Sequence, residues 1–479
     1  MFLWRRPDRA ALVRDLAALA EELDGPSPKR LDRLSHSVHI EERGRRLPDH
    51  GGVRLGIVAT SLADLRDKLG RSQELAARAD SRVEERGLYL SDAPPARPEQ
   101  VCFLFPGQGA QYVGMLEDLM RHGALGSESL TRADEVLAGL LPRPVSSYIY
   151  PRHDLDEAAN GRHQAALDDT RIAQPAIGVM SLFAMDVLLQ FGLRPAFVAG
   201  HSYGEYVALC AAGLTSREDL LRTSALRSRA VYEAGRECPG GMVVVAASEA
   251  DTRAALAELG IPAEIANVNA PRHVVVAGPV EAIDAVLEQL PGRGFVVWRV
   301  SVTSAFHTAV LEPSSIAFKR HLETVPMALP RIPVYGNATA APYPADIGAI
   351  RHQMAYHLAR PVRFVELLLA LHRDGARVFV EVGPARILTG LVGRTLNGRP
   401  HAALALDMRA QSSWLRLAVL LARTHALGLP IDLSAWFEPF SLNGSDPRPL
   451  SDSLAPPGRS SRSERSGDTP AARVAPESR

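Results

Sequence analysis

Ser202 has the sequence surroundings of a nucleophile. In "AGHSYGEYV" Gly200 and Gly204 flank it two residues away on either side, which matches the pattern G-x-S-x-G. Glycine at these positions lets the backbone turn sharply and lets neighbouring segments approach the serine closely. The preceding "AFVAG" predicts a strand and the following "EYVALCAAG" a helix, whose N-terminal N–H groups would face an oxyanion at Ser202. The pattern alone leaves two interpretations, a nucleophile and an ordinary helix N-cap.

A serine hydroxyl needs a base to take its proton, and His307 is the candidate. It lies in "VSVTSAFHTAV", just after a predicted strand. His201 is adjacent to Ser202, but side chains of adjacent residues diverge, so His201 is poorly placed for this role. The other histidines are expected to be ordinary surface or core residues.

Arg227 falls on the apolar side of a helix predicted over residues 216–233. Thr215 and Glu218 form a capping box at its start, and helical spacing places Arg227 beside Leu220. A buried guanidinium needs an anionic partner, because an unpaired buried charge is very costly. That partner is either an internal carboxylate or the carboxylate of a substrate, which the planar guanidinium can bind in bidentate fashion.

The bulk composition is that of an ordinary globular protein. The 479 residues carry 54 Lys+Arg and 54 Asp+Glu, so net charge gives no argument for nucleic acid or an anionic membrane. The three cysteines are odd in number and lack metal-ligand spacing, which indicates a reducing environment. The N-terminal segment is unlike a secretory signal, and no run of about 18 apolar residues predicts a membrane span. We therefore expect a soluble, cytoplasmic protein.

The chain divides into predicted segments. Residues 1–95 are expected to form a small α/β module, with an amphipathic helix near its start and Ser61 as the N-cap of a second helix. Strands and helices then alternate over 96–410, which predicts an α/β domain with a parallel, helix-covered sheet. Inside it, residues 241–300 follow the order β-α-β-β-α-β of a ferredoxin-like subdomain. A long apolar helix in the same domain is predicted to begin at "PAIGVM", with Pro175 in its first turn.

The C-terminal part of the chain changes character. Residues 411–445 contain a helix and an apolar segment that close the folded part. Residues 446–479 have almost no large apolar side chains, so they are predicted to be disordered.

Seven motifs resemble, in order, those of malonyl-CoA:acyl-carrier-protein transacylases, most strongly the acyltransferase domains of polyketide synthases. They are "FLFPGQGAQYVGM", "TRIAQPAIG", "GHSYGEYVALCAAG", "ANVNAPRHVVVAGP", "SAFHT", "HLARPVRF" and "VEVGPARILTGL". The resemblance covers about residues 100–440 and implies an α/β-hydrolase-like acyltransferase domain with the inserted subdomain. Residues 1–95 are similar to the linker between a ketosynthase and such a domain, and 411–445 to the linker that wraps back after it. Since the sequence contains neither a ketosynthase nor a carrier domain, the resemblance implies a discrete enzyme acting in trans.

The resemblance also implies catalytic roles. Ser202 matches the acylated nucleophile and His307 the general base and acid. The backbone carbonyl of His357, at a position where many relatives carry Gln or Asn, would orient His307. Gln108 and the backbone N–H of Tyr203 match the oxyanion-hole positions.

Four further residues match substrate-binding positions of the family. Arg227 corresponds to the arginine that pairs with the malonyl carboxylate. Phe306 resembles the malonyl-type selector, where methylmalonyl enzymes more often have Ser, although Ser304 stands where the family commonly has His. Gln174 and Asn267 occupy motif positions near the active site.

The implied reaction is transfer of a malonyl group from malonyl-CoA to the phosphopantetheine thiol of an acyl carrier protein, in polyketide (including antibiotic) or related fatty-acid-like biosynthesis. It needs no cofactor or metal, and a ketosynthase-containing polyketide synthase is a further expected partner. Alternatives are an acyl-carrier-protein hydrolase of the same fold, against which Arg227 argues, and a catalytically idle docking scaffold, against which the intact site residues argue. A lipase-type hydrolase would want an acid between Ser202 and His307 in sequence and an HGGG-like loop, and neither is evident.

Overall fold

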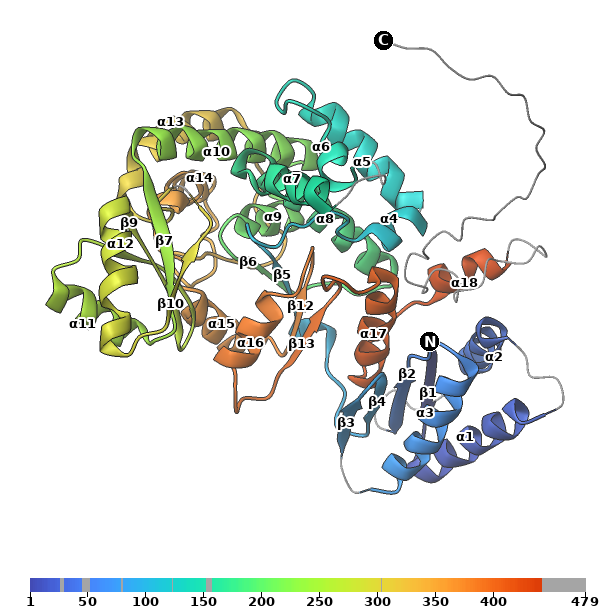
Figure 1. The fold of residues 1–479 in the computed structure, drawn as a ribbon. Coiled ribbons are helices and arrows are strands. Elements are labelled where there is room, and N and C mark those ends of the chain that lie inside the picture. Colours follow the sequence, from blue (N-terminus) through green and yellow to red (C-terminus); the bar gives the residue numbers. More distant parts are fainter. Residues whose placement is uncertain are drawn as a thin grey trace, which may run out of the picture.

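Three β-sheets organise the part of the chain that the structure describes (Figure 1). This structure is a computed structural model, and it describes residues 1–25, 30–44, 52–78, 81–122, 124–151, 157–302 and 304–441. The C-terminal residues 446–479, predicted to be disordered, lie outside the described residues.

The N-terminal sheet is antiparallel, with the strand order β1-β2-β4-β3. Its strands are β1 (Phe2–Arg6), β2 (Val53–Ile57), β3 (Arg82–Glu85) and β4 (Leu88–Ser91). The helices of this module are α1 (Arg9–Leu23), α2 (Leu31–Gly44) and α3 (Leu62–Ala76). Ser61 caps α3 by accepting a hydrogen bond from the Asp64 N–H, as its sequence position predicts. Apolar side chains of the sheet and helices form a separate small core.

The central sheet is parallel throughout, with the order β11-β6-β5-β12-β13. Its strands are β5 (Val101–Phe105), β6 (Phe197–Gly200), β11 (Val334–Tyr335), β12 (Val378–Glu381) and β13 (Ala402–Ala405). Alternate residues of β5 enter two different cores, because successive side chains of a strand point to opposite faces: Phe103 and Phe105 on one face, Cys102 and Leu104 on the other. Helices therefore cover both faces, as the alternating sequence pattern predicts.

Helix α8 (Thr170–Gln190) forms the centre of the larger core. It begins five residues before the predicted start, because the Asp169 side chain caps it through the Arg171 N–H, so Pro175 lies inside the helix. Pro175 has no N–H to offer the carbonyl of Arg171, and that carbonyl instead accepts a hydrogen bond from the Ser228 hydroxyl at 3.4 Å.

By length and composition α8 could also cross a membrane, since its mean hydropathy is 1.7. However, 89% of its apolar window is buried inside the fold. The expectation that no apolar run of this length exists is therefore wrong, and the physical reason is that a helix surrounded by protein is apolar on all sides.

Helix α10 (Arg217–Glu237) begins one residue later than predicted, and so does its cap. Ser216, not Thr215, accepts the hydrogen bond from the Asp219 N–H, and the buried Thr215 hydroxyl has no hydrogen-bond partner in the part of the chain that the structure describes. The predicted apolar stripe is present, and Arg227 lies within it.

The third sheet is antiparallel, with the order β10-β7-β9-β8. Along the chain its elements are β7 (Gly240–Val245), α11 (Glu249–Leu259), β8 (Glu264–Ala270), β9 (His273–Pro279), α12 (Val280–Gln289) and β10 (Val297–Val300), which is the succession β-α-β-β-α-β. Strand β8 meets the larger domain through two backbone hydrogen bonds: Val268 N–H donates to the Val362 carbonyl at 2.8 Å, and Val362 N–H to the Ala266 carbonyl at 2.9 Å.

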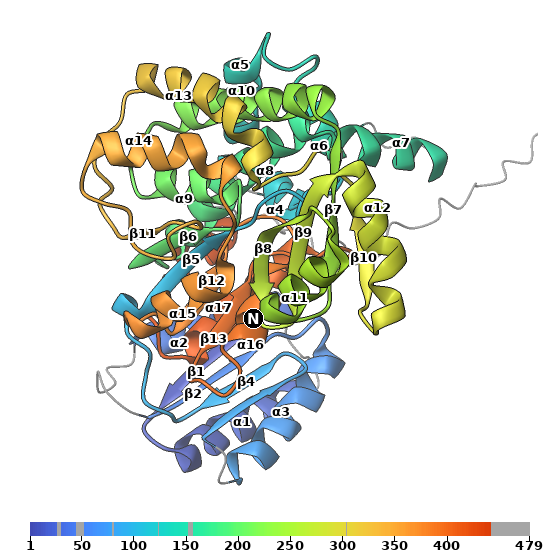
Figure 2. The same ribbon diagram turned by 90° about the vertical axis from the view of Figure 1, so that its left-hand side faces the viewer.

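The remaining helices surround these sheets (Figure 2). They are α4 (Glu117–His122), α5 (Ala124–Leu137), α6 (Val145–Ile149), α7 (Glu157–Asp168), α9 (Gly204–Ala211), α13 (Glu312–Thr324), α14 (Ile347–Tyr356), α15 (Phe364–Arg373), α16 (Leu388–Thr395), α17 (Ser413–Ala426) and α18 (Ser434–Ser441). Short 3₁₀ turns cover Pro98–Gln100, Pro291–Arg293, Ala309–Leu311 and His357–Ala359.

Helix α17 packs between the N-terminal sheet and the central domain (Figure 1). The guanidinium of Arg54 on β2 donates to the Ala426 carbonyl at 3.0 Å, and the His425 ring donates to the Trp4 carbonyl of β1 at 2.8 Å. A Cβ on Gly56 would lie 2.7 Å from the Ala422 carbonyl oxygen, so only glycine lets the helix lie this close to β2.

Candidate active site

Ser202 occupies a strained turn between β6 and α9. Its backbone φ is +50°, in the left-handed region that residues other than glycine rarely adopt. A Cβ on Gly200 would overlap the backbone of Gly204, and one on Gly204 would overlap the carbonyl of Phe105. Both glycines of the motif are therefore required by the close approach of backbone segments.

The Ser202 hydroxyl does not cap α9, which has no side-chain cap. Its Oγ instead lies 2.7 Å from Nε2 of His307, 105 residues further along the chain. The geometry favours the nucleophile over the N-cap interpretation. His201 turns away from this pair, with its Nε2 2.6 Å from Oδ1 of Asn269, so the predicted divergence of the adjacent side chains is present.

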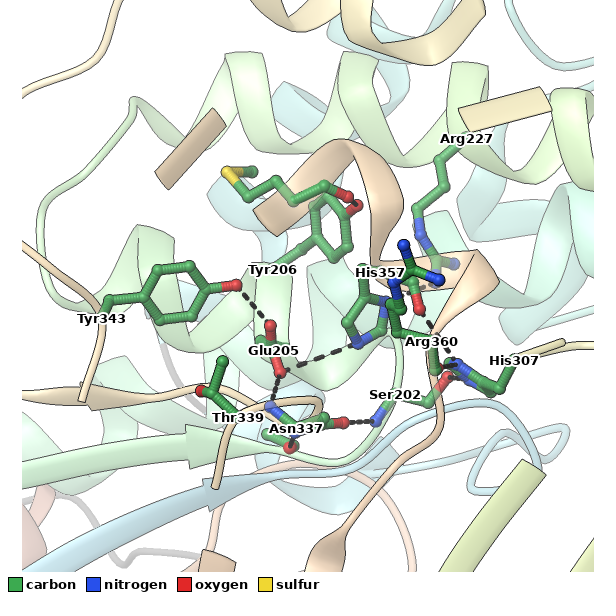
Figure 3. Close-up of polar contacts among 12 residues, drawn as sticks. Ser202, Glu205, Tyr206, Arg227, His307, Asn337, Thr339, Tyr343, His357 and Arg360 are labelled. Carbon is green, nitrogen blue, oxygen red and sulfur yellow. Dashed lines mark hydrogen bonds and ion pairs between the residues drawn. The ribbon is translucent and has the colours of Figure 1, made fainter. Parts of the chain in front are cut away.

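His307 is buried, and its protonation pattern follows from its contacts. Nδ1 lies 3.2 Å from the carbonyl oxygen of His357 and 3.1 Å from that of Arg360 (Figure 3). Carbonyl oxygens only accept, so Nδ1 carries the hydrogen and Nε2 presents a lone pair to Ser202. Burial, followed by the positive charge of Arg227, lowers the pKa of His307 to about 3, so the ring is neutral and can accept a proton.

The loop "PGQG" brings Gln108 against the same turn. A Cβ on Gly107 would overlap the carbonyl oxygen of His201, so glycine is needed for the loop to approach this closely. Within the described part of the chain, neither the backbone N–H of Gln108 nor that of Tyr203 donates a hydrogen bond. Both residues line the cavity that contains Ser202, which makes their N–H groups available to an oxyanion there.

Arg227 is buried, with 1% of its surface exposed, and its contacts within the described residues are all neutral. Nη1 donates to Oε1 of Gln174 at 2.6 Å, and Nη2 lies 3.3 Å from Nδ1 of His357. The guanidinium lies 4.9 Å from the centre of the Tyr206 ring. No described carboxylate comes within ion-pair distance, so the internal salt bridge left open by the sequence is absent there, and a buried cation faces the cavity without an anion.

A cavity of about 630 Å³ between the central domain and the third sheet brings the predicted residues together. Its lining includes Ser202, His307, Arg227, Gln108, Tyr203, Gln174, Asn267 and Phe306. His357 lies behind this lining, where its backbone contacts His307 and its side chain contacts Arg227. Apolar side chains of the third sheet, Met242 and Val244 among them, form much of the facing wall.

Sequence reasoning missed three residues that brace the site. Oδ1 of Asn337 accepts the Ser202 N–H at 2.7 Å, and its Nδ2 donates to the Gly200 carbonyl at 2.6 Å. Glu205, also buried, accepts the Asn337 N–H, and Arg360 supplies the second carbonyl that faces His307. Asn337 follows the short strand β11, and no spacing rule connects it to a serine 135 residues away.

Comparison with known proteins decides the family. Residues 102–427 match the family described as "Acyl transferase domain". The chain belongs to this acyl transferase family. Among the described residues, no group of three or more His, Cys, Asp or Glu side chains could hold a metal ion.

Relatives of this acyltransferase include both very large and small proteins. Polyketide synthase GfsA of Streptomyces halstedii is 31% identical over 427 residues, which cover 85% of this chain but 6% of the synthase. The malonyl CoA-acyl carrier protein transacylase of Bacillus subtilis is 30% identical over 298 residues, covering 61% of this chain and 89% of that protein. The chain thus spans only a small part of the synthase, and nearly the whole of the transacylase aligns with it.

A solved structure shows the same architecture. The acyl transferase domain of SpnD, in complex with 2-(pent-4-yn-1-yl)malonyl, superposes with a TM-score of 0.72 at 27% identity, covering 90% of this chain and 97% of that domain. The predicted α/β fold class with its parallel sheet is confirmed by this likeness and by the central sheet itself.

Proposed function

We propose that this acyltransferase moves a malonyl group from malonyl-CoA to the phosphopantetheine thiol of an acyl carrier protein through an acyl-serine on Ser202, in polyketide or related biosynthesis. The observation that carries the proposal is the shared cavity of Ser202, His307 and an Arg227 without a carboxylate partner. The names of the Bacillus transacylase and of the SpnD complex support both the malonyl group and the carrier protein.

The first half-reaction forms the acyl-enzyme. Ser202 Oγ attacks the thioester carbonyl of malonyl-CoA while Nε2 of His307 takes the hydroxyl proton. The oxyanion lies between the N–H groups of Gln108 and Tyr203, and the C–S bond then breaks. The proton on His307 passes to the coenzyme A thiolate, which leaves as a thiol, and Arg227 pairs with the free malonyl carboxylate throughout.

The second half-reaction reverses the roles. The carrier thiol gives its proton to His307 and attacks the acyl-serine carbonyl, and the Ser202–acyl bond breaks as His307 returns the proton to Oγ. A second substrate that enters after the first product has left gives ping-pong kinetics. No step needs a cofactor or a metal.

Intact-mass spectrometry tests the proposal. The protein is mixed with malonyl-, methylmalonyl- or acetyl-CoA, with and without a carrier protein, beside the variant Ser202→Ala. We expect a malonyl adduct that moves to the carrier, and no adduct on Ser202→Ala. Release of free malonate without transfer would favour the hydrolase, and biological function retained in Ser202→Ala would favour the scaffold.

The variant Arg227→Ala tests the acyl preference separately. Removal of this buried cation from the cavity wall should lower the malonylation rate by roughly 10²-fold, because a charge-assisted bidentate pair is lost, while acetylation falls less. The matched control is Arg222→Ala, on the solvent side of the same helix, where Arg222 pairs with Asp219. Equal losses for both acyl groups would contradict the assignment of Arg227.

A further inference from the structure

The side chain of His357 stands between a buried cation and a buried carboxyl (Figure 3). Its Nδ1 lies 3.3 Å from Nη2 of Arg227, and its Nε2 lies 3.7 Å from Oε2 of Glu205. All three side chains are almost fully buried, with relative exposures of 1% for Arg227 and 2% for the other two. The reaction described above uses only the backbone carbonyl of His357, so the imidazole has no role in it.

The contact with Arg227 fixes the protonation of this imidazole. A guanidinium only donates, so Nδ1 must present its lone pair, and the single ring hydrogen belongs on Nε2, where it points toward Glu205. Nε2 has no hydrogen-bond partner closer than this carboxyl within the described residues. Burial, followed by the electrostatic influence of the nearby His307 ring and of the Arg227 cation, lowers the pKa of His357, which agrees with a neutral ring.

Two neutral donors bind the carboxyl of Glu205. The Tyr343 hydroxyl donates to Oε1, and the Asn337 N–H donates to Oε2. Burial raises the pKa of Glu205 to about 7, while the hydrogen bonds from Tyr343 and Asn337 and, after them, the charge of Arg227 act in the opposite direction. Glu205 is therefore a buried carboxyl that responds to Arg227 but is separated from it by one imidazole ring.

A second neutral acceptor, Gln174, binds Nη1 of Arg227. Gln174 accepts from Nη1, its own Nε2 donates to the Thr170 hydroxyl at 3.1 Å, and that hydroxyl donates to Oε1 of Gln108 at 2.9 Å. Arg227 is thus held by two neutral acceptors, and one of them leads to the proposed oxyanion loop. This arrangement keeps the guanidinium in place without neutralising it.

We propose that the side chain of His357 is a positioning residue for acyl selection, a proposal that rests on the function proposed above. It accepts from Arg227 and separates this cation from Glu205, so that the charge of Arg227 stays available to the carboxylate of an incoming acyl group. Without the imidazole, attraction across a low-dielectric interior draws the guanidinium and the carboxyl together. An internal Arg227–Glu205 pair then competes with the substrate carboxylate.

Four variants test the proposal through the acylation of Ser202 by malonyl-CoA and acetyl-CoA. His357→Leu removes both ring nitrogens but keeps the backbone carbonyl that faces His307. We expect the KM for malonyl-CoA to rise roughly tenfold or more, because hydrogen bonds to a charged group are lost, with a smaller change in the saturated rate and in acetylation. His357→Gln, whose amide can accept from Arg227 and donate to Glu205, should remain near the wild type.

The double variant His357→Leu/Glu205→Gln separates charge competition from simple loss of packing. Removing the competing carboxylate should restore part of the malonyl-CoA affinity, whereas a purely structural role of His357 predicts no recovery. Arg227→Ala sets the scale for complete loss of the cation. An unchanged malonyl-CoA KM in His357→Leu, or no recovery in the double variant, overturns the inference.

Failure of this inference is distinguishable from failure of the proposed function. A wild-type protein that shows no preference for malonyl-CoA over acetyl-CoA defeats the proposed function. A wild-type preference that His357→Leu retains defeats only the inference. If His357→Leu does not fold, ¹⁵N NMR of the wild type labelled at histidine decides the question at neutral pH. The His357 signal is identified as the one that is missing from the His357→Gln variant. The Nε2–H tautomer supports the inference, and the Nδ1–H tautomer or an imidazolium overturns it.

Discussion

The proposed nucleophile and the proposed base share an unusual backbone conformation. Ser202 has a φ of +50° and His307 a φ of +62°, and each such residue costs about 1–3 kcal/mol relative to a relaxed backbone. The cost is tolerated because the surroundings fix both residues: Asn337 binds the Ser202 N–H, and two carbonyls face the His307 ring. These strained conformations bring Ser202 Oγ within 2.7 Å of Nε2 of His307, as the proposed roles of nucleophile and base require.

The charge of Arg227 should make the pH below which the acylation rate falls depend on the acyl group. His307 accepts a proton only when neutral, and Arg227 is the second cause, after burial, of its lowered pKa. A malonyl carboxylate on Arg227 offsets that charge and raises the pKa of His307 in the complex, whereas an acetyl group does not. The saturated single-turnover acylation rate should therefore fall off at a higher pH with malonyl-CoA than with acetyl-CoA.

Single-turnover acylation assays over a series of acidic pH values measure the fall in rate for malonyl-CoA and for acetyl-CoA on the same protein. Acetyl-CoA is the matched control, because it has the same thioester and nucleotide but no carboxylate. If the two rates fall at the same pH, or if the rate with malonyl-CoA falls at the lower pH, electrostatic coupling between Arg227 and His307 is contradicted.

The sequence singled out the residues proposed to carry the chemistry, which the structure brings into one cavity, but it did not single out the residues that hold them in place. Ser202 is marked by its flanking glycines, and Arg227 by its place on an apolar stripe. Asn337, Glu205 and Arg360 have no comparable local signal, because they reach the site only through the tertiary fold. The choice between an internal and an external partner for Arg227 likewise depended on which carboxylates lie near it.

At the scale of elements, the spacing of apolar residues predicted the type of helices and strands reliably, but it did not predict where the helices begin. The parallel sheet and its covering helices follow from alternating apolar segments. The starts of α8 and α10 were misplaced because competing caps, Asp169 and Ser216, lie close to the predicted ones. Which hydroxyl or carboxylate reaches a free N–H depends on backbone angles that composition does not specify.

The turn between β6 and α9 should tolerate no side chain at Gly204. A Cβ there would overlap the carbonyl of Phe105, which is backbone of the central strand and cannot move aside. We expect Gly204→Ala to destabilise the protein by about 3 kcal/mol or more. Thermal unfolding followed by circular dichroism measures the effect.

The matched control for this substitution is Gly393→Ala in α16. A Cβ on Gly393 meets nothing within 4 Å, so alanine should be neutral or stabilise the helix by up to about 1 kcal/mol. Similar melting temperatures for the two variants would show that the overlap at Gly204 relaxes at little cost.

At the scale of the whole molecule, α17 joins the N-terminal module to the acyl transferase domain, and His425 is a buried titratable group in that junction. Its ring donates to the Trp4 carbonyl of β1, and burial, followed by the charges of Arg54 and Arg5, lowers its pKa from 6.5 to about 4. The unfolded chain therefore binds a proton at a higher pH than the folded one. The burial of a neutral His425 therefore does not lower the free energy of unfolding above pH 6.5. Below pH 6.5 the unfolded chain takes up the proton first, so the free energy of unfolding decreases as the pH falls toward 4.

His425→Gln should remove this part of the acid sensitivity, because its amide can still donate to Trp4 but does not titrate. Between pH 7 and pH 4 the wild type should lose about 3 kcal/mol more of its free energy of unfolding than the variant, as 2.5 pKa units correspond to roughly that energy. Urea unfolding at a series of pH values measures the difference, and the pair at pH 8, where both side chains are neutral, is the internal reference. Other buried histidines, His307 among them, contribute equally to both curves and cancel in the comparison. Parallel curves from pH 8 to pH 4 would mean that water reaches the junction and solvates the His425 cation in the folded protein.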